Sequence, residues 1–148
     1  MNRLVSTTMS IIVSSAFVTG ALAHDGATGV VKQRMDAMSA IGNANKSLSN
    51  IARGRADFDL DTVTSAAASI AEHSQASALE FFVEGTEGGV SDAKAEIWQD
   101  WEKFSGLMTD LNRAAVSLSQ ISAQDEFAAA YKDVTATCGS CHKAFRAK

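Results

Sequence analysis

The chain has 148 residues, of which 46% are hydrophobic and 20% are charged, and its formal net charge at pH 7 is −4. It contains no proline and only two cysteines. Because the acidic balance leaves no basic stripe for phosphate backbones, we expect no nucleic-acid partner. Two cysteines in a single motif are also too few ligands for a closed zinc site.

The first 23 residues have the pattern of a secretory signal peptide. Arg3 gives a positive start, an apolar stretch follows, and Ala21-Leu22-Ala23 fits a small-residue cleavage site. A membrane anchor is the alternative, but interspersed serines and threonines weaken a spanning helix. We therefore predict cleavage of residues 1–23, a periplasmic location and one mature domain over 24–148, without stable membrane insertion. Since Arg3 is the only charged residue removed, 12 of the 13 basic and all 17 acidic residues remain, a formal charge of −5.

In the first half of the mature chain, apolar residues recur at three- and four-residue steps, which is typical of amphipathic helices. The first helix is expected over about 29–53, with Gly54 marking its end. Its apolar face is expected to be Val31, Met35, Met38, Ile41, Leu48 and Ile51. The second should begin at Asp59 or Asp61, either of which can cap it. Its apolar residues are Val63, Ala67, Ile70, Ala78, Phe81 and Phe82, and three glycines then predict a loop.

The second half predicts two further helices. One begins after Ser91-Asp92, a plausible N-cap, and its inward seam is expected to be Ile97, Trp101, Phe104, Met108, Leu111, Ala115 and Leu118. The last begins near Ser122, with Asp125 in its first turn, and carries the stripe Phe127, Tyr131, Val134, Cys138, Cys141 and Phe145. Short connections between the helices favour an all-α fold, an antiparallel up-down-up-down four-helix bundle.

The most informative motif is Cys138-Gly139-Ser140-Cys141-His142. It is the C-x-x-C-H attachment signature of a c-type haem, in which each thiol adds to one vinyl group and the histidine is held under the iron. His142 follows Cys138 by four residues, so a helix places both thiols and the imidazole toward one side. We therefore expect haem to be bound covalently on the C-terminal helix, inside the bundle. A haem-free pair of cysteines that forms a disulfide after export remains the alternative.

The mature chain resembles the cytochrome c′ family, the class II c-type cytochromes. The ending from Cys138 to Arg146 is similar to the family's C-x-x-C-H-x-x-aromatic-Arg pattern. Ala95-Glu96-Ile97-Trp98, after a glycine-rich segment, resembles the start of its third helix, and Arg34 with Met38 four residues later resembles its first-helix pattern. Val83 stands where the family often has a proline, which puts the shape of that loop in question.

The resemblance implies one haem c per chain, with Cys138 and Cys141 as thioether attachments and His142 as the proximal iron ligand. It places Met38 at the distal position, where members of the family have either a ligating methionine or a non-ligating apolar residue. Met35, three residues earlier, is the competing methionine. The resemblance also puts Arg34 near a haem propionate and Arg146 near the proximal face, although both could equally be solvated helix charges.

These residues predict a single-electron carrier with His142 and Met38 as axial ligands. The alternative is a five-coordinate protein that binds nitric oxide or carbon monoxide, and the remote alternative is a haem-free interaction domain with a Cys138–Cys141 disulfide. No catalytic constellation stands out, so we expect no enzymatic activity. Redox partner proteins are expected but not identified by the sequence, and a homodimer is possible.

Overall fold

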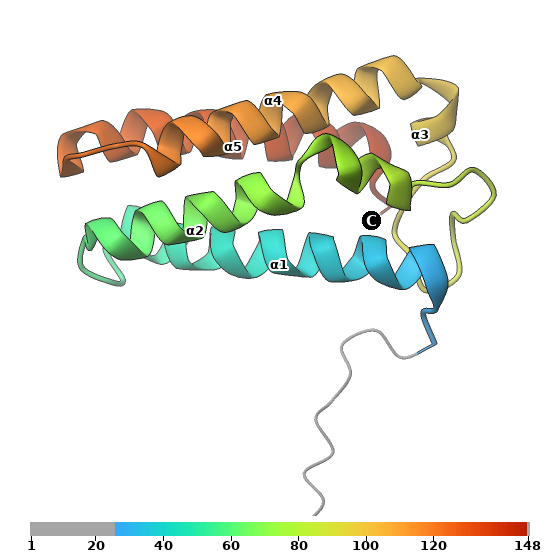
Figure 1. The fold of residues 1–148 in the computed structure, drawn as a ribbon, viewed down its shortest axis with the longest axis horizontal. Coiled ribbons are helices and arrows are strands. Elements are labelled where there is room, and N and C mark those ends of the chain that lie inside the picture. The colour runs from blue at the N-terminus through green and yellow to red at the C-terminus, as the bar shows by residue number, and fades with distance from the viewer. Residues whose placement is uncertain (1–25, 148) are drawn as a thin grey trace, which may run out of the picture.

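The computed structural model describes residues 26–147, so the predicted signal peptide and cleavage site lie outside the described residues. Four long helices form an antiparallel up-down-up-down bundle: α1 (Gly29–Ala52), α2 (Leu60–His73), α4 (Trp101–Ser119) and α5 (Gln124–Phe145) (Figure 1). Two short helices, the 3₁₀ helix η1 (Ala76–Phe81) and α3 (Glu96–Gln99), lie in the connection between α2 and α4. Within residues 26–147 the only β structure is one isolated bridge between Ala93 and Arg146. This confirms the predicted fold class.

The predicted helix ends are mostly confirmed. α1 ends at Ala52, and Gly54 has the positive φ of +64° that lets the chain turn away. The side chain of Asp59 caps α2 by accepting a hydrogen bond of 2.8 Å from the backbone N–H of Thr62. At α5 the partner is Glu126 rather than Asp125, since the Glu126 carboxylate accepts from the backbone N–H groups of residues 122 and 123.

Two predicted helices are interrupted. The second ends at His73 and does not continue to Phe82. At this end the buried Ser74 hydroxyl donates a hydrogen bond of 2.7 Å to the carbonyl of Ile70. The third is broken at Asp100, whose φ of −131° and ψ of 57° separate α3 from α4. Trp101, predicted in the inward seam, is therefore 39% exposed, whereas the other six residues of that seam are buried.

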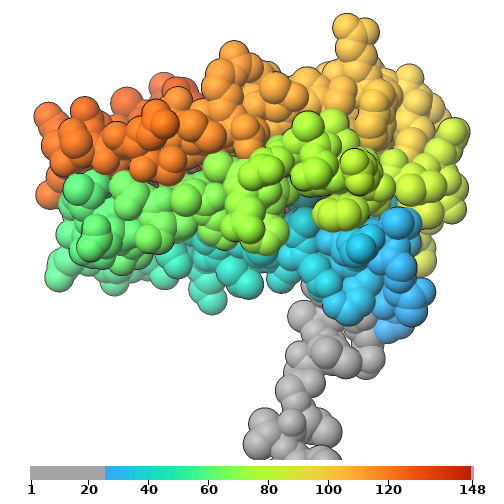
Figure 2. Space-filling view, in the orientation of Figure 1, coloured from blue at the N-terminus to red at the C-terminus, as the bar shows by residue number. Residues whose placement is uncertain are grey.

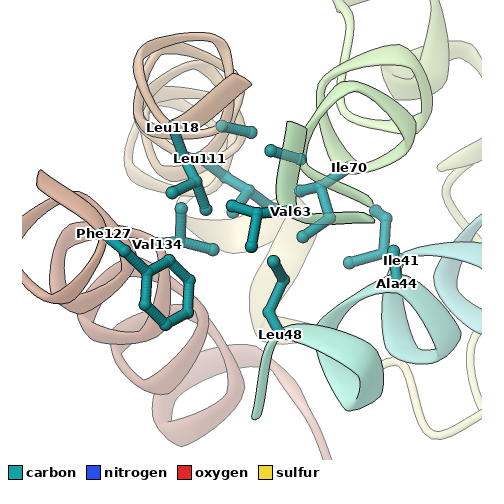
Figure 3. Close-up of a cluster of buried hydrophobic side chains, with 11 residues drawn as sticks. Ile41, Ala44, Leu48, Val63, Ile70, Leu111, Leu118, Phe127 and Val134 are labelled. Carbon is teal, nitrogen blue, oxygen red and sulfur yellow. The ribbon is translucent and has the colours of Figure 1, made fainter. Parts of the chain in front are cut away.

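Most of the interior is an aliphatic core between the four long helices. α1 packs closely on α2, α2 on α4 and α4 on α5, whereas α1 and α5 are not a closely packed pair. Figure 3 shows side chains from all four helices meeting in this core. Its buried members are Ile41, Ala44, Leu48, Val63, Ala67, Ile70, Leu111, Ala115, Leu118, Phe127 and Val134.

A second, aromatic core lies where α2 has ended. Its buried members are Ala78, Phe82, Ile97, Phe104, Met108 and Phe145. Met38 packs against both cores. The buried line of α1 is Arg34, Ala37, Ile41, Ala44 and Leu48, so the predicted apolar face is displaced and Val31 and Met35 are only half-buried.

No helix among the described residues is both long and apolar enough to span a membrane.

Candidate functional site

A cavity of about 490 Å³ lies between α1 and α5, bordered by α4 and by residues of the 82–97 connection. Its volume falls in the range of sites that enclose small molecules and cofactors. Apolar side chains dominate its wall, notably Met38, Phe82, Phe104, Met108 and Phe145. The cavity occupies the side of the bundle where two helices are not closely packed, so space for a ligand is built into the fold.

Both cysteines of the C-x-x-C-H motif lie on α5 and line this cavity as free, half-buried thiols. Cys138 packs against the aliphatic core and Cys141 against the aromatic core. Burial raises the pKa of the Cys138 thiol. Burial, followed by the neighbouring Cys138, raises the pKa of Cys141 to about 11. Both groups are therefore neutral thiols at physiological pH.

His142 follows directly on α5 and also lines the cavity, at its solvent-exposed edge. Partial burial lowers the pKa of its imidazole, and the positive charge of Arg146 lowers it further. A lowered pKa favours the neutral ring, which is the form that binds a metal ion. The motif thus presents two thiols and an imidazole of lowered pKa to one partly open cavity, as its helical spacing predicts.

Both methionines considered from the sequence lie on α1 and line the cavity. Met35 and Met38 are each half-buried. Met38 is in addition packed between the two cores. Of the two thioethers, that of Met38 is therefore the one integrated into the interior.

Arg34 is almost fully buried, with 2% of its surface exposed. Its two terminal nitrogens donate to the Phe81 carbonyl at 3.3 Å, to the Thr86 hydroxyl and carbonyl at 2.9 and 2.7 Å, and to the Ser91 hydroxyl at 2.9 Å. The guanidinium carbon also lies 5.4 Å from the centre of the Phe82 ring. The solvated helix charge considered from the sequence is therefore wrong, because Arg34 holds the loop onto α1.

One donor of Arg34 is left over. Its Nε is buried and has no hydrogen-bond partner, while the residue lines the cavity. Buried donors are nearly always paired, so an isolated one beside a cavity is chemically suited to an acceptor on a ligand. A carboxylate of a haem propionate fits that requirement.

Arg146 lies at the C-terminal end of α5 and pairs with Asp92. Its Nε and Nη2 donate to one Asp92 oxygen at 3.2 and 3.0 Å, with both side chains more than half exposed. Two backbone hydrogen bonds join the same two segments of the chain. The Lys94 N–H donates to the Phe145 carbonyl, and the Ala147 N–H donates to the Asp92 carbonyl. Asp92 therefore anchors the loop to α5 instead of capping a helix.

Together these contacts make the 82–95 segment a strap between α1 and α5. Arg34 holds one part of it, and residues 144–147 hold the other. Sequence reasoning missed Thr86, Ser91 and Asp92 as structural partners of the site. The glycine-rich composition indicated only a loop, although the two arginines singled out from the sequence are the residues that fasten it.

The residue set fits a covalently attached haem. It combines two neutral thiols, an imidazole of lowered pKa, an apolar volume and an unpaired buried donor. A methionine thioether reaches the same volume from another helix. Imidazole and thioether are both established axial ligands of haem iron.

Comparisons with known proteins agree with this chemistry. A family model described as Cytochrome C′ matches residues 29–146. The chain is 37% identical over 122 residues to cytochrome c-556 from Agrobacterium tumefaciens (strain B2A). The aligned region covers 81% of this chain and 98% of that protein. It is 34% identical over 123 residues to cytochrome c′ from Rhodopseudomonas palustris (strain ATCC BAA-98 / CGA009), covering 82% of this chain and 84% of that protein.

Solved structures give the same result. Cytochrome c′ from Rhodopseudomonas palustris superposes with a TM-score of 0.76 and 32% identity, covering 82% of this chain and 98% of that one. A variant of cytochrome c′ from Alcaligenes xylosoxidans, solved as a nitric oxide complex, superposes with a TM-score of 0.69 and 28% identity, covering 80% and 94%.

Proposed function

The chain belongs to the cytochrome c′ family, and we propose that it is a periplasmic haem protein that binds a small uncharged gas such as nitric oxide or carbon monoxide. Its cofactor is haem c, covalently attached, with one per chain. The bound haem supplies an iron that can hold a diatomic ligand or exchange one electron. The residues described above supply attachment, axial ligation and the shape of the ligand site.

We propose that Cys138 and Cys141 form the two thioethers and that His142 is the proximal ligand. The support is that all three line one cavity from a single helix. Acid-acetone extraction should leave the colour on the chain, and Cys138→Ser or Cys141→Ser should each lose one thioether by peptide mass. Colour that passes into the solvent would reject this attachment.

The observation that carries the gas-binding proposal is the packing of Met38. Its side chain lies between the aliphatic and aromatic cores and lines the cavity from α1, whereas His142 lines it from α5. A side chain held by apolar packing on both sides can fill the distal space without ligating the iron. The apolar wall would then admit a small neutral molecule and exclude larger polar ones.

The comparisons favour this reading over the electron carrier expected first from the sequence. The Alcaligenes xylosoxidans relative was solved with nitric oxide bound, and it covers most of this chain. Electron carriage with Met38 as sixth ligand remains the second candidate. What favours it is that the Met38 thioether, a competent haem ligand, reaches the same cavity as His142.

Visible and near-infrared spectra of the haem-loaded protein decide between the two. We expect the wild-type protein to be high-spin and to bind carbon monoxide readily when reduced. A low-spin spectrum with the weak near-infrared band of sulfur-to-iron charge transfer would contradict gas binding at an open site and support the electron carrier.

Met38→Ala and Met35→Ala are the matched variants. Under the gas-binding proposal neither changes the spin state, and Met38→Ala alone speeds carbon monoxide binding because it enlarges the distal space. If Met38 ligates, Met38→Ala removes the near-infrared band. A band that survives Met38→Ala and disappears in Met35→Ala would identify Met35 as the ligand.

We propose further that the protein is exported, forms a homodimer as family members often do, and has no enzymatic activity of its own. Sedimentation equilibrium of the holoprotein tests the dimer, and a single monomeric species at tens of micromolar would reject it. Saturable, rapid turnover of a specific substrate would contradict the absence of catalysis.

A further inference from the structure

The exposed apolar side chains gather at the end of the molecule that holds the cavity. Four large apolar residues among those described are more than a third exposed, and three of them belong to the 83–101 segment. These are Val83 at 46%, Val90 at 48% and Trp101 at 39%, whereas Val116 at 37% lies in the last turn of α4, far from the cavity end. Figures 1 and 2 show this segment, coloured from yellow-green to gold, at one end of the bundle.

The same segment is strongly acidic. Residues 80–103 contain seven of the chain's 17 acidic residues but only two of its 13 basic ones. The acidic side chains are Glu80, Glu84, Glu87, Asp92, Glu96, Asp100 and Glu102, all at exposed positions. One of the two basic residues, Lys94, forms an ion pair with Glu96. Asp92 pairs with Arg146 from outside the segment. The exposed apolar residues thus belong to a segment with seven acidic and two basic residues, a formal charge of −5.

An aromatic path leads from this surface to the cavity. The ring of Trp101 lies 5.6 Å from that of Phe104, which lies 5.5 Å from that of Phe145, measured between centroids. Phe104 and Phe145 are buried and line the cavity. Cys141 packs against the cluster that contains both rings. The exposed indole is therefore connected by closely packed rings to one of the proposed attachment points.

We propose that this acidic face, defined as residues 80–103 and including the exposed Trp101, is the docking site of a one-electron partner protein with a lysine- or arginine-rich surface. In the complex the partner's reduced centre loses one electron and the ferric haem gains it, with no proton or atom transferred. The inference rests on the haem of the proposed function and adds the surface through which electrons reach it.

Charge complementarity is the argument for this partner. An acidic surface steers a basic protein into an encounter and rejects an acidic one. Weak electron-transfer complexes bury small interfaces, and aromatic side chains are enriched in interface cores. A segment with one exposed tryptophan, two exposed valines and seven exposed carboxylates has this composition. Such a complex should weaken steeply as salt increases.

Mitochondrial cytochrome c, a lysine-rich one-electron carrier, is a suitable probe for NMR titration of the ¹⁵N-labelled holoprotein. We expect perturbed resonances to concentrate in residues 83–103 and to revert when salt is raised. The triple variant Glu84→Gln, Glu87→Gln, Glu102→Gln should weaken binding about tenfold, from three modest charge contributions. Perturbations centred on the outer faces of α1 and α2 would overturn the proposal.

The matched control removes the same charge at the opposite end, with Asp57→Asn, Asp61→Asn and Asp125→Asn. It should weaken binding less than about twofold, because distant exposed charges are screened. Equal weakening by both triple variants would mean that only net charge matters, which also overturns the proposal.

The indole has its own test. Trp101→Ala should slow electron transfer from the ferrous holoprotein to the oxidised probe, whose His/Met-ligated haem has the higher potential, more than it weakens binding. Val116→Ala, at a similarly exposed apolar position on the same helix, should change neither. Equal effects of the two variants would exclude Trp101 as the contact. Carbon monoxide binding should be unchanged in both variants, so failure of the docking site and failure of the gas-binding proposal are distinguishable.

Discussion

The two ends of the bundle are built differently, although the same helices run through both. In the aliphatic core, seven of the eleven buried residues have no exposed surface at all. In the aromatic core every buried residue keeps between 2% and 9% of its surface, next to a cavity of about 490 Å³. The first end is closed by the protein alone, and the second leaves room that a cofactor completes.

The residues that stabilise the fold and the residues that form the haem site therefore lie mostly at opposite ends of the bundle. Apolar burial in the closed end stabilises the packing of the four long helices. At the open end, polar contacts of the strap take over, since Arg34 and residues 144–147 tie α1 and α5 through the 82–95 segment. Substitutions should therefore affect stability or the haem according to the end in which they lie.

The largest expected effect on stability is in the closed end. Leu48→Ala should lower the free energy of unfolding by about 2–5 kcal/mol, because it leaves a cavity among fully buried neighbours. The visible spectrum should stay unchanged. Met108→Ala, in the cavity wall, should instead alter the haem spectrum or carbon monoxide affinity. Urea unfolding followed by circular dichroism, together with spectra, makes the comparison, and equal spectral changes in both variants would contradict the division.

A smaller, local effect is expected in the strap. Arg34→Gln should cost roughly 1–3 kcal/mol, because the part-buried carbonyls of Phe81 and Thr86 lose their charged donor. Amide hydrogen exchange should become faster in residues 84–94 and remain slow around Leu48 and Ile70. Lys32→Gln, an exposed position of the same helix, is the control. Uniformly faster exchange in both ends would show that the strap and the core unfold as one unit.

The smallest expected effect on stability is in the connection between α4 and α5, at the closed end of the bundle. Two backbone N–H groups, of Ser122 and Ala123, hold the pKa of Glu126 below its usual value. The unfolded chain therefore binds the proton more readily, and this stabilisation is present above the usual glutamate pKa of about 4.3 and is lost as pH falls below it.

Glu126→Gln should accordingly lower the melting temperature slightly at pH 7, with the difference closing below about pH 4. Asp125→Asn, the adjacent carboxyl, should show a smaller difference from the wild type. A gap between Glu126→Gln and wild type that is the same at both pH values would show that the carboxylate charge contributes nothing.

The helices and the bundle follow from apolar periodicity and end signals. Gly54 and Asp59 mark helix ends as predicted because their effects are local. The breaks at Ser74 and Asp100 are not predictable in this way, since serine and aspartate are ordinary residues within many helices. The exposure of Trp101 follows from the second break, which interrupts the spacing that begins at Ile97.

The site divides similarly. The motif on α5 predicts its own geometry, because residues three and four apart share a helix face. The burial of Arg34 depends on hydrogen bonds to Thr86 and Ser91, which are more than fifty residues away. The local sequence around Arg34 therefore does not predict its burial. Likewise, the Arg146–Asp92 pair joins residues 54 positions apart.

The early end of α2 has a consequence for how much a bundle of this kind can hold. At about 1.5 Å per residue, the 24 residues of α1 extend about 36 Å and the 14 residues of α2 about 21 Å. The longer helix thus overhangs its neighbour by about 15 Å, and the cavity wall described here includes residues of α1, α4 and α5 but none of α2. Because α2 ends before Ser74, the short helix η1 and not a long helix packs on this part of α1, and no residue of α2 takes part in enclosing the cavity.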